Sequence, residues 1–347
     1  MRAIILVGGL GTRLRPLTDH VPKPLVPIAG EPLMTRTLRR LRRQGVREIT
    51  LAVQYLAADF RTAYGDGAAL DLDLRIVEEP FPLGTAGAVR FALAAHGDLP
   101  NGATLVLNGD ELTDLDVAAL WQHHQTSGGV ATIAVRHVAD PTAFGVVVRD
   151  ERGWVTAFQE KPAPGTALAN TINSGAYVFE RAVIERIPAE QFAMLERDVF
   201  PTLLAERALV AAYPHSAYSQ DIGTLAGYLT ANEAVLLGRL PAEKPTGREF
   251  APGVWLADGV QIAPDATLIA PIMLGAGTVV AAGATLQRVI AWERVTIGAG
   301  ATVRSSVLAS DSHVPAAAQL DGQAVGTAGI GDRGSVVFMA FHCNVSL

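Results

Sequence analysis

The chain has 347 residues, of which 49% are hydrophobic and 18% are charged, and its formal net charge is −6. This composition predicts a globular protein of about two domains and argues against nucleic-acid binding, which normally needs a basic surface. The apolar runs are too short to span a membrane and the single cysteine, Cys343, excludes an internal disulfide, so we expect a cytoplasmic protein.

The first part of the chain, residues 1–238, begins as alternating strands and helices. Residues 3–7 form a continuous apolar run, which is typical of a strand buried on both faces. Further strands are predicted at residues 48–53, 74–78 and 104–107, and helices at residues 32–44, 57–64, 85–95 and 115–126. This order indicates an α/β fold with a doubly wound, mixed but mainly parallel sheet of Rossmann-like type.

The middle of this domain has a different pattern. Strand-like segments at residues 130–138, 145–148, 155–158 and 176–179 follow one another with few helices between them. We interpret them as an antiparallel extension of the sheet that holds a second ligand. Helices return at residues 195–206 and 224–237.

The chain changes period after a predicted linker at residues 239–250. Aliphatic residues recur every six positions, a spacing that neither a helix nor an ordinary strand produces: Leu256, Ile262, Leu268, Leu274, Val280 and Leu286, then Ile297 and Val303 after a slip. Period six is typical of a hexapeptide-repeat β-helix, expected here at residues 251–320. Residues 321–347 form a tail whose apolar run, residues 336–341, is a candidate cap or subunit contact.

The strongest chemical signal directly follows the first strand. Gly8, Gly9 and Gly11 allow backbone N–H groups to approach phosphate oxygens closely. Arg13 adds a planar fork of donors, and Lys23 adds a point charge. The segment lacks the GxxxxGK[ST] pattern of a Walker A loop and the third glycine of a dinucleotide fingerprint.

The segment from Gly8 to Thr18, followed by Pro22-Lys23-Pro24-Leu25-Val26-Pro27, resembles the sugar-1-phosphate nucleotidyltransferase family. Within that family it most resembles mannose-1-phosphate guanylyltransferases. The resemblance extends over almost the whole chain, including a left-handed β-helix after the catalytic domain. It implies transfer of a nucleoside monophosphate from a nucleoside triphosphate to a sugar 1-phosphate, with release of pyrophosphate.

The resemblance also implies residue roles. Arg13, Lys23, Asp110 and Asp221 would be catalytic, and the two aspartates would hold Mg²⁺, which prefers few protein ligands. Asp110 ends a buried strand and should emerge at the same sheet edge as the glycines. The expected nucleotide-binding residues are Val7, Gly8, Gly9, Gly11, Thr12, Arg13, Lys23, Gln54, Gly84, Thr85 and Gly109. The expected sugar-phosphate-binding residues are Gly145, Glu160, Lys161 and Asn173.

Two alternatives stay open at this point. Thymidylyl-, uridylyl- and adenylyltransferases acting on glucose 1-phosphate or a related sugar phosphate share these motifs. A catalytically inactive regulatory subunit would belong to another functional class, although the presence of Arg13, Lys23, Asp110, Lys161 and Asp221 favours an enzyme. GTP with mannose 1-phosphate is the expected substrate pair, and a homo-oligomer, dimer or tetramer, is expected.

Four arginines share one face of the helix predicted from residue 32. Arg36, Arg39, Arg40 and Arg43 follow the i, i+3, i+4, i+7 spacing. In an acidic protein such a face is expected to be solvated or to contact another subunit.

Overall fold

The computed structural model describes residues 1–95, 97, 99 and 101–326, and these group into two compact units. The first unit comprises Met1–Gly9, Thr37–Gly109 and Thr113–Ser219. The second comprises Leu10–Arg36, Asp110–Leu112 and the described residues from Gln220 onward. The boundary expected from sequence at residue 238 therefore falls inside the second unit. The apolar run at residues 336–341 lies outside the described residues.

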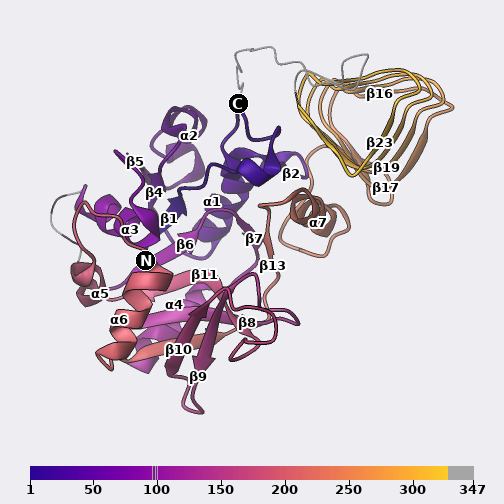
Figure 1. The fold of residues 1–347 in the computed structure, drawn as a ribbon. Coiled ribbons are helices and arrows are strands. Elements are labelled where there is room, and N and C mark those ends of the chain that lie inside the picture. The colour runs from indigo at the N-terminus through magenta and orange to yellow at the C-terminus, as the bar shows by residue number, and fades with distance from the viewer. Residues whose placement is uncertain (96, 98, 100, 327–347) are drawn as a thin grey trace. The chain divides into compact units, whose positions relative to one another are not determined.

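The first unit is built on a nine-stranded mixed sheet (Figure 1). Strand β1 pairs in parallel with β4 and β6, and β4 pairs in parallel with β5. Antiparallel pairs extend the sheet through β11, β9 and β10, and β8 pairs with β11 and β12. The strands are β1 (Arg2–Val7), β4 (Glu48–Val53), β5 (Asp73–Glu78), β6 (Thr104–Asn108), β8 (Ala131–His137), β9 (Gly145–Arg149), β10 (Val155–Glu160), β11 (Thr171–Phe179) and β12 (Val210–Pro214). The predicted α/β fold with an antiparallel extension is confirmed.

Helices pack against this sheet and bury its aliphatic side chains. Helix α3 packs on β1 and β4, α4 on β8 and β12, and α6 on β10. The α-helices of the chain are α1 (Leu33–Arg43), α2 (Ala57–Tyr64), α3 (Gly84–Ala94), α4 (Val117–Ser127), α5 (Arg181–Arg186), α6 (Phe200–Ala205) and α7 (Leu225–Leu236). The helix predicted at residues 195–206 is divided into a π-helical turn, η4 (Leu195–Val199), and α6, which begins at Phe200 and carries a proline in its first turn.

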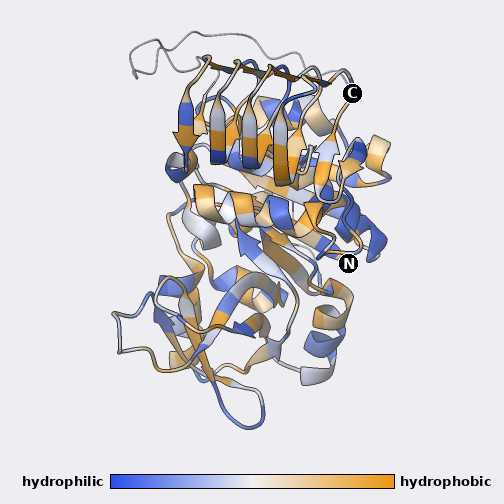
Figure 2. Cartoon of the chain, turned by 90° about the vertical axis from the view of Figure 1, so that its right-hand side faces the viewer, coloured by the Kyte–Doolittle hydropathy of each residue, from blue (hydrophilic) through white to orange (hydrophobic). Residues whose placement is uncertain are grey.

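The second unit ends in a stack of parallel strands, drawn side by side in Figure 2. One sheet contains β14 (Arg248–Ala251), β15 (Val254–Leu256), β17 (Thr267–Leu274), β19 (Thr285–Ala291), β21 (Thr302–Leu308), β23 (Gln319–Asp321) and β24 (Ala324–Val325). The other contains β16 (Gln261–Ile262), β18 (Val279–Val280), β20 (Thr296–Ile297) and β22 (His313–Val314). Except for the antiparallel β14–β15 pair, neighbouring strands in both sheets are parallel.

The register of these strands explains the sequence period. Thr267 pairs with Thr285, 18 residues later, and Thr285 pairs with Thr302, 17 residues later. One coil is therefore three hexapeptides long, and the slip in the sequence pattern is a coil shortened by one residue. The period-six side chains form the core, although Ile262 and Leu268 near its start are only partly buried. The predicted β-helix is confirmed.

Residues 10–32, which follow Gly8 and Gly9 and which we call the signature segment, belong to the same compact unit as the β-helix. It contains the short turns η1 (Thr12–Leu14) and η2 (Lys23–Leu25) and the hairpin β2 (Pro27–Ile28) and β3 (Glu31–Pro32). Helix α7 joins this segment to the coils, because the buried Tyr228 hydroxyl donates to the Pro27 carbonyl and accepts from Trp292 Nε1 at 3.0 Å. The Asn232 side chain also accepts from the Ala29 N–H at 2.7 Å.

The expectation for the four arginines is wrong for two of them. Arg36 and Arg40 are buried, whereas Arg39 and Arg43 are exposed. Arg36 Nη1 lies 2.9 Å from Glu243 Oε2 and 3.1 Å from the Lys244 carbonyl. Helical spacing shows which side chains share a face but not which distant segment covers it, and here the covering segment comes from the predicted linker.

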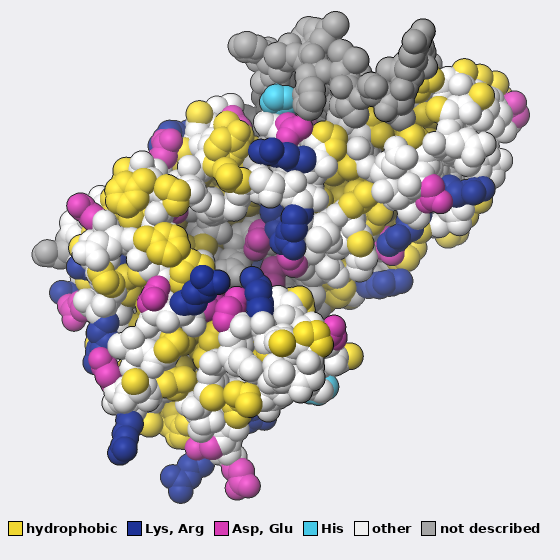
Figure 3. Space-filling model, in the orientation of Figure 1, with side chains coloured by type: hydrophobic (Ala, Val, Ile, Leu, Met, Phe, Trp, Pro, Cys, Tyr) yellow, Lys and Arg dark blue, Asp and Glu magenta, His cyan; other side chains and the backbone are white. Residues whose placement is uncertain are grey.

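In the part of the chain that the structure describes, no helix is both long and apolar enough to cross a membrane. On the face drawn in Figure 3, lysine and arginine side chains are interspersed with aspartate and glutamate side chains.

Candidate active site

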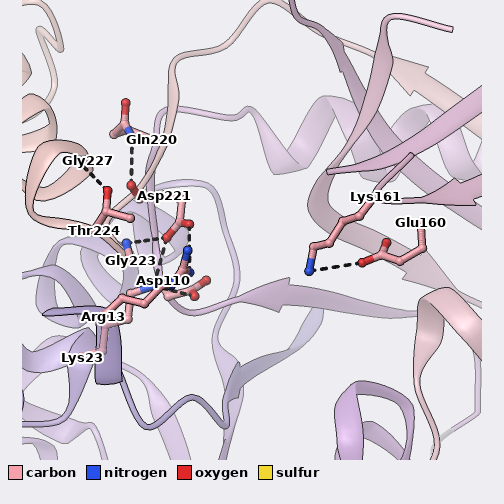
Figure 4. Close-up of polar contacts among 10 residues, drawn as sticks. All are labelled: Arg13, Lys23, Asp110, Glu160, Lys161, Gln220, Asp221, Gly223, Thr224 and Gly227. Carbon is pink, nitrogen blue, oxygen red and sulfur yellow. Dashed lines mark hydrogen bonds and ion pairs between the residues drawn. The ribbon is translucent and has the colours of Figure 1, made fainter. Parts of the chain in front are cut away.

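A compact charged cluster in the second unit contains all four residues expected to be catalytic (Figure 4). Lys23 Nζ lies 2.8 Å from Asp110 Oδ2 and 3.0 Å from Asp221 Oδ1. Arg13 Nη2 lies 3.8 Å from Asp221 Oδ2. We call these residues, together with Gly223, the carboxylate cluster. The structure thus brings together side chains that are far apart in sequence, such as Lys23 and Asp221, which are 198 positions apart.

Burial distinguishes the members of the cluster. The Lys23 side chain is 6% exposed, whereas the side chains of Asp110 and Asp221 are 44% and 40% exposed. An ammonium so deeply buried needs compensating charge, and the two carboxylates supply it. Arg13 is 68% exposed and lies at the outer side of Asp221, so its guanidinium remains accessible to a ligand.

Local backbone geometry fixes the cluster. Lys23 begins the turn η2 between Pro22 and Pro24, whose rings restrict the backbone on both sides. Gly223 donates its N–H to Asp221 Oδ1 at 2.6 Å. A Cβ at position 223 would lie only 2.7 Å from Arg13 Nη2 and 3.0 Å from Lys23 Nζ. Any side chain there would displace the cations, so glycine is required for this close approach.

The turn that carries Arg13 is shaped by a second glycine. Gly11 has a positive φ of 63°, and its carbonyl accepts a hydrogen bond from the Thr18 hydroxyl at 2.8 Å. A Cβ on Gly11 would lie 3.1 Å from the Thr18 side chain. Thr12 and Arg13 follow directly in η1, so the left-handed backbone at Gly11 sets their direction.

A second group of expected residues lies in the first unit, where parallel strands end. Val7 ends β1, and its carbonyl accepts from the Gln54 N–H at 3.4 Å. Gly109 follows β6 and donates its N–H to the Leu6 carbonyl at 2.9 Å. A Cβ on Gly8 would lie 3.5 Å from Gln54 Oε1. The carboxyl ends of β1, β4 and β6 therefore meet, as expected for a ligand-binding edge of an α/β sheet.

Glu79 belongs to this edge, although the sequence analysis did not name it. It follows β5, is 8% exposed, and its Oε2 accepts from the Leu83 N–H at 3.1 Å. Its Oε1 lies 3.9 Å from the position of a Cβ on Gly8. Burial raises the pKa of the Glu79 carboxyl above its ordinary value, while the Leu83 hydrogen bond opposes that rise.

Gly84 and Thr85 lie in the first turn of helix α3. A Cβ on Gly84, whose φ is 72°, would lie 2.5 Å from the Ala193 carbonyl oxygen. The Thr85 hydroxyl donates to Glu196 Oε2 at 3.0 Å and accepts from the Leu195 N–H at 2.8 Å. Both residues thus join the start of α3 to the π-helical turn η4. Burial raises the pKa of Glu196.

The residues expected to bind the sugar phosphate lie on adjacent strands of the first unit. Glu160 on β10 pairs with Gly145 on β9. Ile172 of β11 pairs with Val146, so Asn173 lies one step further along, at the level of Gly145. A Cβ on Gly145 would lie 3.0 Å from Glu160 Oε2. The structure therefore brings Gly145, Glu160 and Asn173 to neighbouring positions of one sheet.

Lys161 and Asn173 are held in different ways. Lys161 has a positive φ of 44°, donates its N–H to the Phe144 carbonyl at 3.0 Å, and has a side chain that is 66% exposed. Its Nζ lies 3.4 Å from Glu160 Oε1. Asn173 accepts from the Gly175 N–H at 3.0 Å and donates to the Tyr177 hydroxyl at 2.7 Å. A lysine in the left-handed region is uncommon and indicates a constrained turn.

The carboxylate cluster fits a divalent cation. Asp110 and Asp221 both reach one ammonium, so their oxygens converge on a single position already occupied by positive charge. Their exposure leaves room for the water and phosphate oxygens that Mg²⁺ also requires. Among the described residues, no group of three or more His, Cys, Asp or Glu could hold a metal by itself. The donor set therefore suits an ion that takes only a few protein ligands.

The expected site residues are divided between the two units. The second unit contains Gly11, Thr12, Arg13, Lys23, Asp110 and Asp221. The first contains Val7, Gly8, Gly9, Gln54, Gly84, Thr85, Gly109, Gly145, Glu160, Lys161 and Asn173.

Gly223 and Glu79 were missed for different reasons. Gly223 lies two residues after Asp221, but only the packing around it shows that a Cβ there would meet Arg13 and Lys23. Glu79 has a weak sequence signal, a carboxylate directly after a predicted strand. Its burial next to Gly8 depends on the pairing of β1 with β4 and of β4 with β5.

Comparisons with known proteins point to one family. Residues 2–237 match the family described as "Nucleotidyl transferase". The chain is 37% identical over 303 residues to a mannose-1-phosphate guanylyltransferase of Mycobacterium tuberculosis, covering 87% of this chain and 82% of the relative. It is 31% identical over 331 residues to a UTP–glucose-1-phosphate uridylyltransferase of Synechocystis, covering 87% and 85%.

Solved structures are also similar to this chain. HddC from Yersinia pseudotuberculosis complexed with GMP-PN is 30% identical, with a TM-score of 0.57 over 67% of this chain and 98% of that one. A putative glucose-1-phosphate thymidylyltransferase from Bacillus anthracis, 21% identical with a TM-score of 0.60, shares the fold. The resemblance carried by Gly8 to Thr18 is thereby confirmed, and the chain belongs to the nucleotidyl transferase family.

Proposed function

We propose that this nucleotidyltransferase transfers GMP from GTP to mannose 1-phosphate, forming GDP-mannose and releasing pyrophosphate. The observation that carries the substrate pair is the 37% identity over 87% of the chain to the guanylyltransferase of Mycobacterium tuberculosis. The segment Pro22–Pro27 supports the same choice. The reaction needs no side-chain nucleophile, because attacker and leaving group are both phosphate anions. Its main obstacle is the repulsion between two polyanions.

Gly11, Arg13 and Lys23 of the second unit are assigned to the triphosphate. The backbone N–H group at Gly11 suits a phosphate oxygen, and the exposed Arg13 guanidinium can donate two parallel hydrogen bonds. Lys23 contributes a second positive charge against the charge that develops on pyrophosphate. Positioning of this kind contributes up to roughly 7–11 kcal/mol to barrier reduction.

Enzymes of this family generally use a divalent metal, and we assign it to Asp110 and Asp221. When bound, Mg²⁺ would neutralise the triphosphate oxygens. The aspartates would hold the ion on one side and leave its remaining positions to water and phosphate.

The sugar phosphate is assigned to the turn after β10. Lys161 is exposed and only loosely paired with Glu160, at 3.4 Å, so its ammonium is available to the sugar phosphate group. Glu160 can then accept hydrogen bonds from sugar hydroxyls, and Asn173 offers both a donor and an acceptor. A Cβ on Gly145 would lie 2.6 Å from the Phe158 ring and 3.0 Å from Glu160 Oε2, so glycine allows both side chains to approach the β9 backbone.

The base is assigned to Glu79 with Gln54. A buried carboxylate with one oxygen engaged by Leu83 has an oxygen left to accept from a base. Guanine offers N–H donors on its pairing edge, whereas the corresponding edge of uracil and thymine is mostly acceptor. Glu79 therefore favours guanine, and Glu79→Gln should lower the preference for GTP over UTP.

The test is a matrix of GTP, UTP, dTTP and ATP against mannose 1-phosphate and glucose 1-phosphate, measured by pyrophosphate release. GTP with mannose 1-phosphate should have the highest kcat/KM. A preference for UTP or dTTP with glucose 1-phosphate would move the chain to the alternative that the Synechocystis relative represents. No turnover with any pair would favour the regulatory-subunit alternative.

We also propose that the β-helix serves assembly and stability, in a homo-oligomer. Its coils hold the signature segment through Tyr228 and Trp292 and carry no residue expected to contact substrate. Light scattering on the full chain and on a chain truncated after residue 238 tests this role. A monomeric full chain would refute the assembly role.

A further inference from the structure

The Lys23 ammonium occupies the position between two carboxylates where a divalent ion is expected. Its Nζ lies 2.8 Å from one carboxylate and 3.0 Å from the other, and its side chain is nearly inaccessible. Arg13 differs, because it approaches only one oxygen of Asp221, at 3.8 Å, and remains 68% exposed. Only one of the two cations of the cluster thus bridges the aspartates.

An ammonium and a divalent ion cannot both occupy the space between the same oxygens. Two positive charges at such a distance repel strongly in a partly buried site. The oxygen of Asp221 that contacts Nζ is also held by the backbone, because the Gly223 N–H donates to Oδ1 at 2.6 Å. A metal must therefore displace Lys23, and the displaced ammonium needs another anion.

We propose that Lys23 is a placeholder cation that keeps the free protein from binding a divalent metal between Asp110 and Asp221 until a triphosphate is present. The triphosphate offers Lys23 a new partner and adds oxygen ligands for the metal. Metal and triphosphate then enter together, with mutually favourable coupling. This inference rests on the proposed role of the two aspartates as metal ligands.

The same arrangement has a second consequence. Without a metal, Lys23 offsets part of the negative charge of the two carboxylates and lies between them, which reduces their repulsion. In a variant without the ammonium, the aspartates would repel each other and would bind a free divalent ion more readily. Metal affinity in the absence of nucleotide thus reports directly on Lys23.

The experiment measures Mn²⁺ binding to the full chain without nucleotide, by electron paramagnetic resonance of free Mn²⁺. Lys23→Met keeps the length of the side chain and removes its charge, and it should bind Mn²⁺ at least about tenfold more tightly than the wild type. Arg13→Met is the matched control and should change the affinity by less than about threefold. In Lys23→Met combined with Asp221→Asn the gain should disappear.

Thermal stability is a second measure of metal binding, and it does not require most of the protein to be saturated with metal. Without nucleotide, Mg²⁺ should raise the Tm of Lys23→Met and leave that of the wild type almost unchanged, because only the variant has a vacant pair of carboxylates. If Lys23→Met does not fold, Mn²⁺ binding by the wild type without nucleotide tests the placeholder role by itself. Tight one-to-one Mn²⁺ binding by the wild type without nucleotide would overturn the placeholder role, and weak binding would support it.

The outcomes separate this inference from the metal assignment. If Asp110→Asn and Asp221→Asn lose Mn²⁺ binding in the presence of a non-hydrolysable GTP analogue, the metal pair stands. If Lys23→Met then binds Mn²⁺ no better than wild type without nucleotide, only the placeholder role fails. If both Asn variants keep full Mn²⁺ binding with the analogue, the metal assignment and the placeholder role fail together.

Discussion

Two lysines expected to bind phosphate have opposite surroundings in the two units. Lys23 is 6% exposed and lies within 3.0 Å of two carboxylates. Lys161 is 66% exposed, has one carboxylate at 3.4 Å and stands on a turn with a positive φ of 44°. One cation is fixed and fully compensated before any ligand arrives, whereas the other is positioned by its backbone and leaves its charge available.

Lys23 and Lys161 thus represent two ways in which a protein can hold a cation that is to bind a polyanion. A buried ammonium costs free energy unless it is paired, so Lys23 depends on Asp110 and Asp221 and couples the triphosphate side to the metal position. An exposed ammonium costs little and its pairing with Glu160 contributes little, so Lys161 can exchange that partner for a phosphate. Mutations in the carboxylate cluster and at Lys161 should therefore differ both in which kinetic constant they change and in how much they change it.

The largest effect is expected at the two aspartates. Asp110→Asn and Asp221→Asn should each lower kcat on the order of 10²-fold or more, because each would remove a proposed metal ligand. Lys23 keeps one carboxylate partner in either variant, so circular dichroism should report an intact fold. EDTA should abolish wild-type turnover and excess Mg²⁺ should restore it. Full activity in EDTA, or in either variant, would remove the metal assignment.

A smaller effect is expected for the loss of the Lys161 side chain, which should change KM more than kcat. Lys161→Ala should raise the KM for the sugar 1-phosphate about tenfold to a hundredfold, since one charge-assisted hydrogen bond is worth about 1.5–3 kcal/mol. Its Tm should stay close to that of the wild type because the side chain is exposed. Arg152→Ala, at an exposed turn of the same unit, is the control and should change neither constant. An unchanged KM in Lys161→Ala would contradict the sugar-phosphate assignment.

The next prediction concerns stability alone. Glu243→Gln removes a carboxylate 2.9 Å from the buried Arg36 guanidinium, and it should lower the free energy of unfolding by about 1–3 kcal/mol. Glu31, at 3.8 Å, compensates only in part. Arg39→Gln, on the exposed side of α1, should cost less than about 0.5 kcal/mol. Equal unfolding midpoints in urea for the two variants would show that the Arg36–Glu243 pair does not hold the signature segment.

The smallest effect is expected at Glu196, whose pKa burial raises. A carboxyl with a raised folded-state pKa is stabilising while protonated, and that contribution is lost as pH rises from the unfolded value through the folded value. Wild-type protein should therefore be slightly less stable at pH 7 than Glu196→Gln, with a Tm difference of about 1–3 °C. The difference should vanish below about pH 4, where glutamate is protonated. If calorimetry gives the same Tm difference at every pH, the difference does not come from ionisation of Glu196.

The sequence predicted those parts of the molecule that depend on local pattern. The apolar runs of the parallel strands and the period-six aliphatics each specify one element, and the register of 18 and 17 residues explains both the repeat and its slip. Family motifs predicted the pairing of Asp110 with Asp221. Neither periodicity nor motif could show that Lys23 bridges them, because that contact depends on the packing of segments far apart in the chain.

Burial by distant segments explains the remaining differences. Arg36 was expected on a solvated or subunit-contacting face, but Glu243 and the Lys244 carbonyl cover it from 207 and 208 positions away. Glu79 became a candidate only when its carboxylate was found buried beside Gly8. A single sequence states which side chains are charged, but compensation between charges is a property of the packed chain.

Direct displacement at the α-phosphorus is the central claim of this account, and its stereochemistry tests it most directly. The chain is incubated with one diastereomer of guanosine 5′-O-(1-thiotriphosphate) and mannose 1-phosphate, and the configuration of the nucleotide-sugar product is determined by ³¹P NMR. A single in-line displacement without an enzyme-bound nucleotidyl intermediate predicts inversion at phosphorus. Retention of configuration would require two displacements, and therefore a nucleophilic side chain, and would contradict the mechanism.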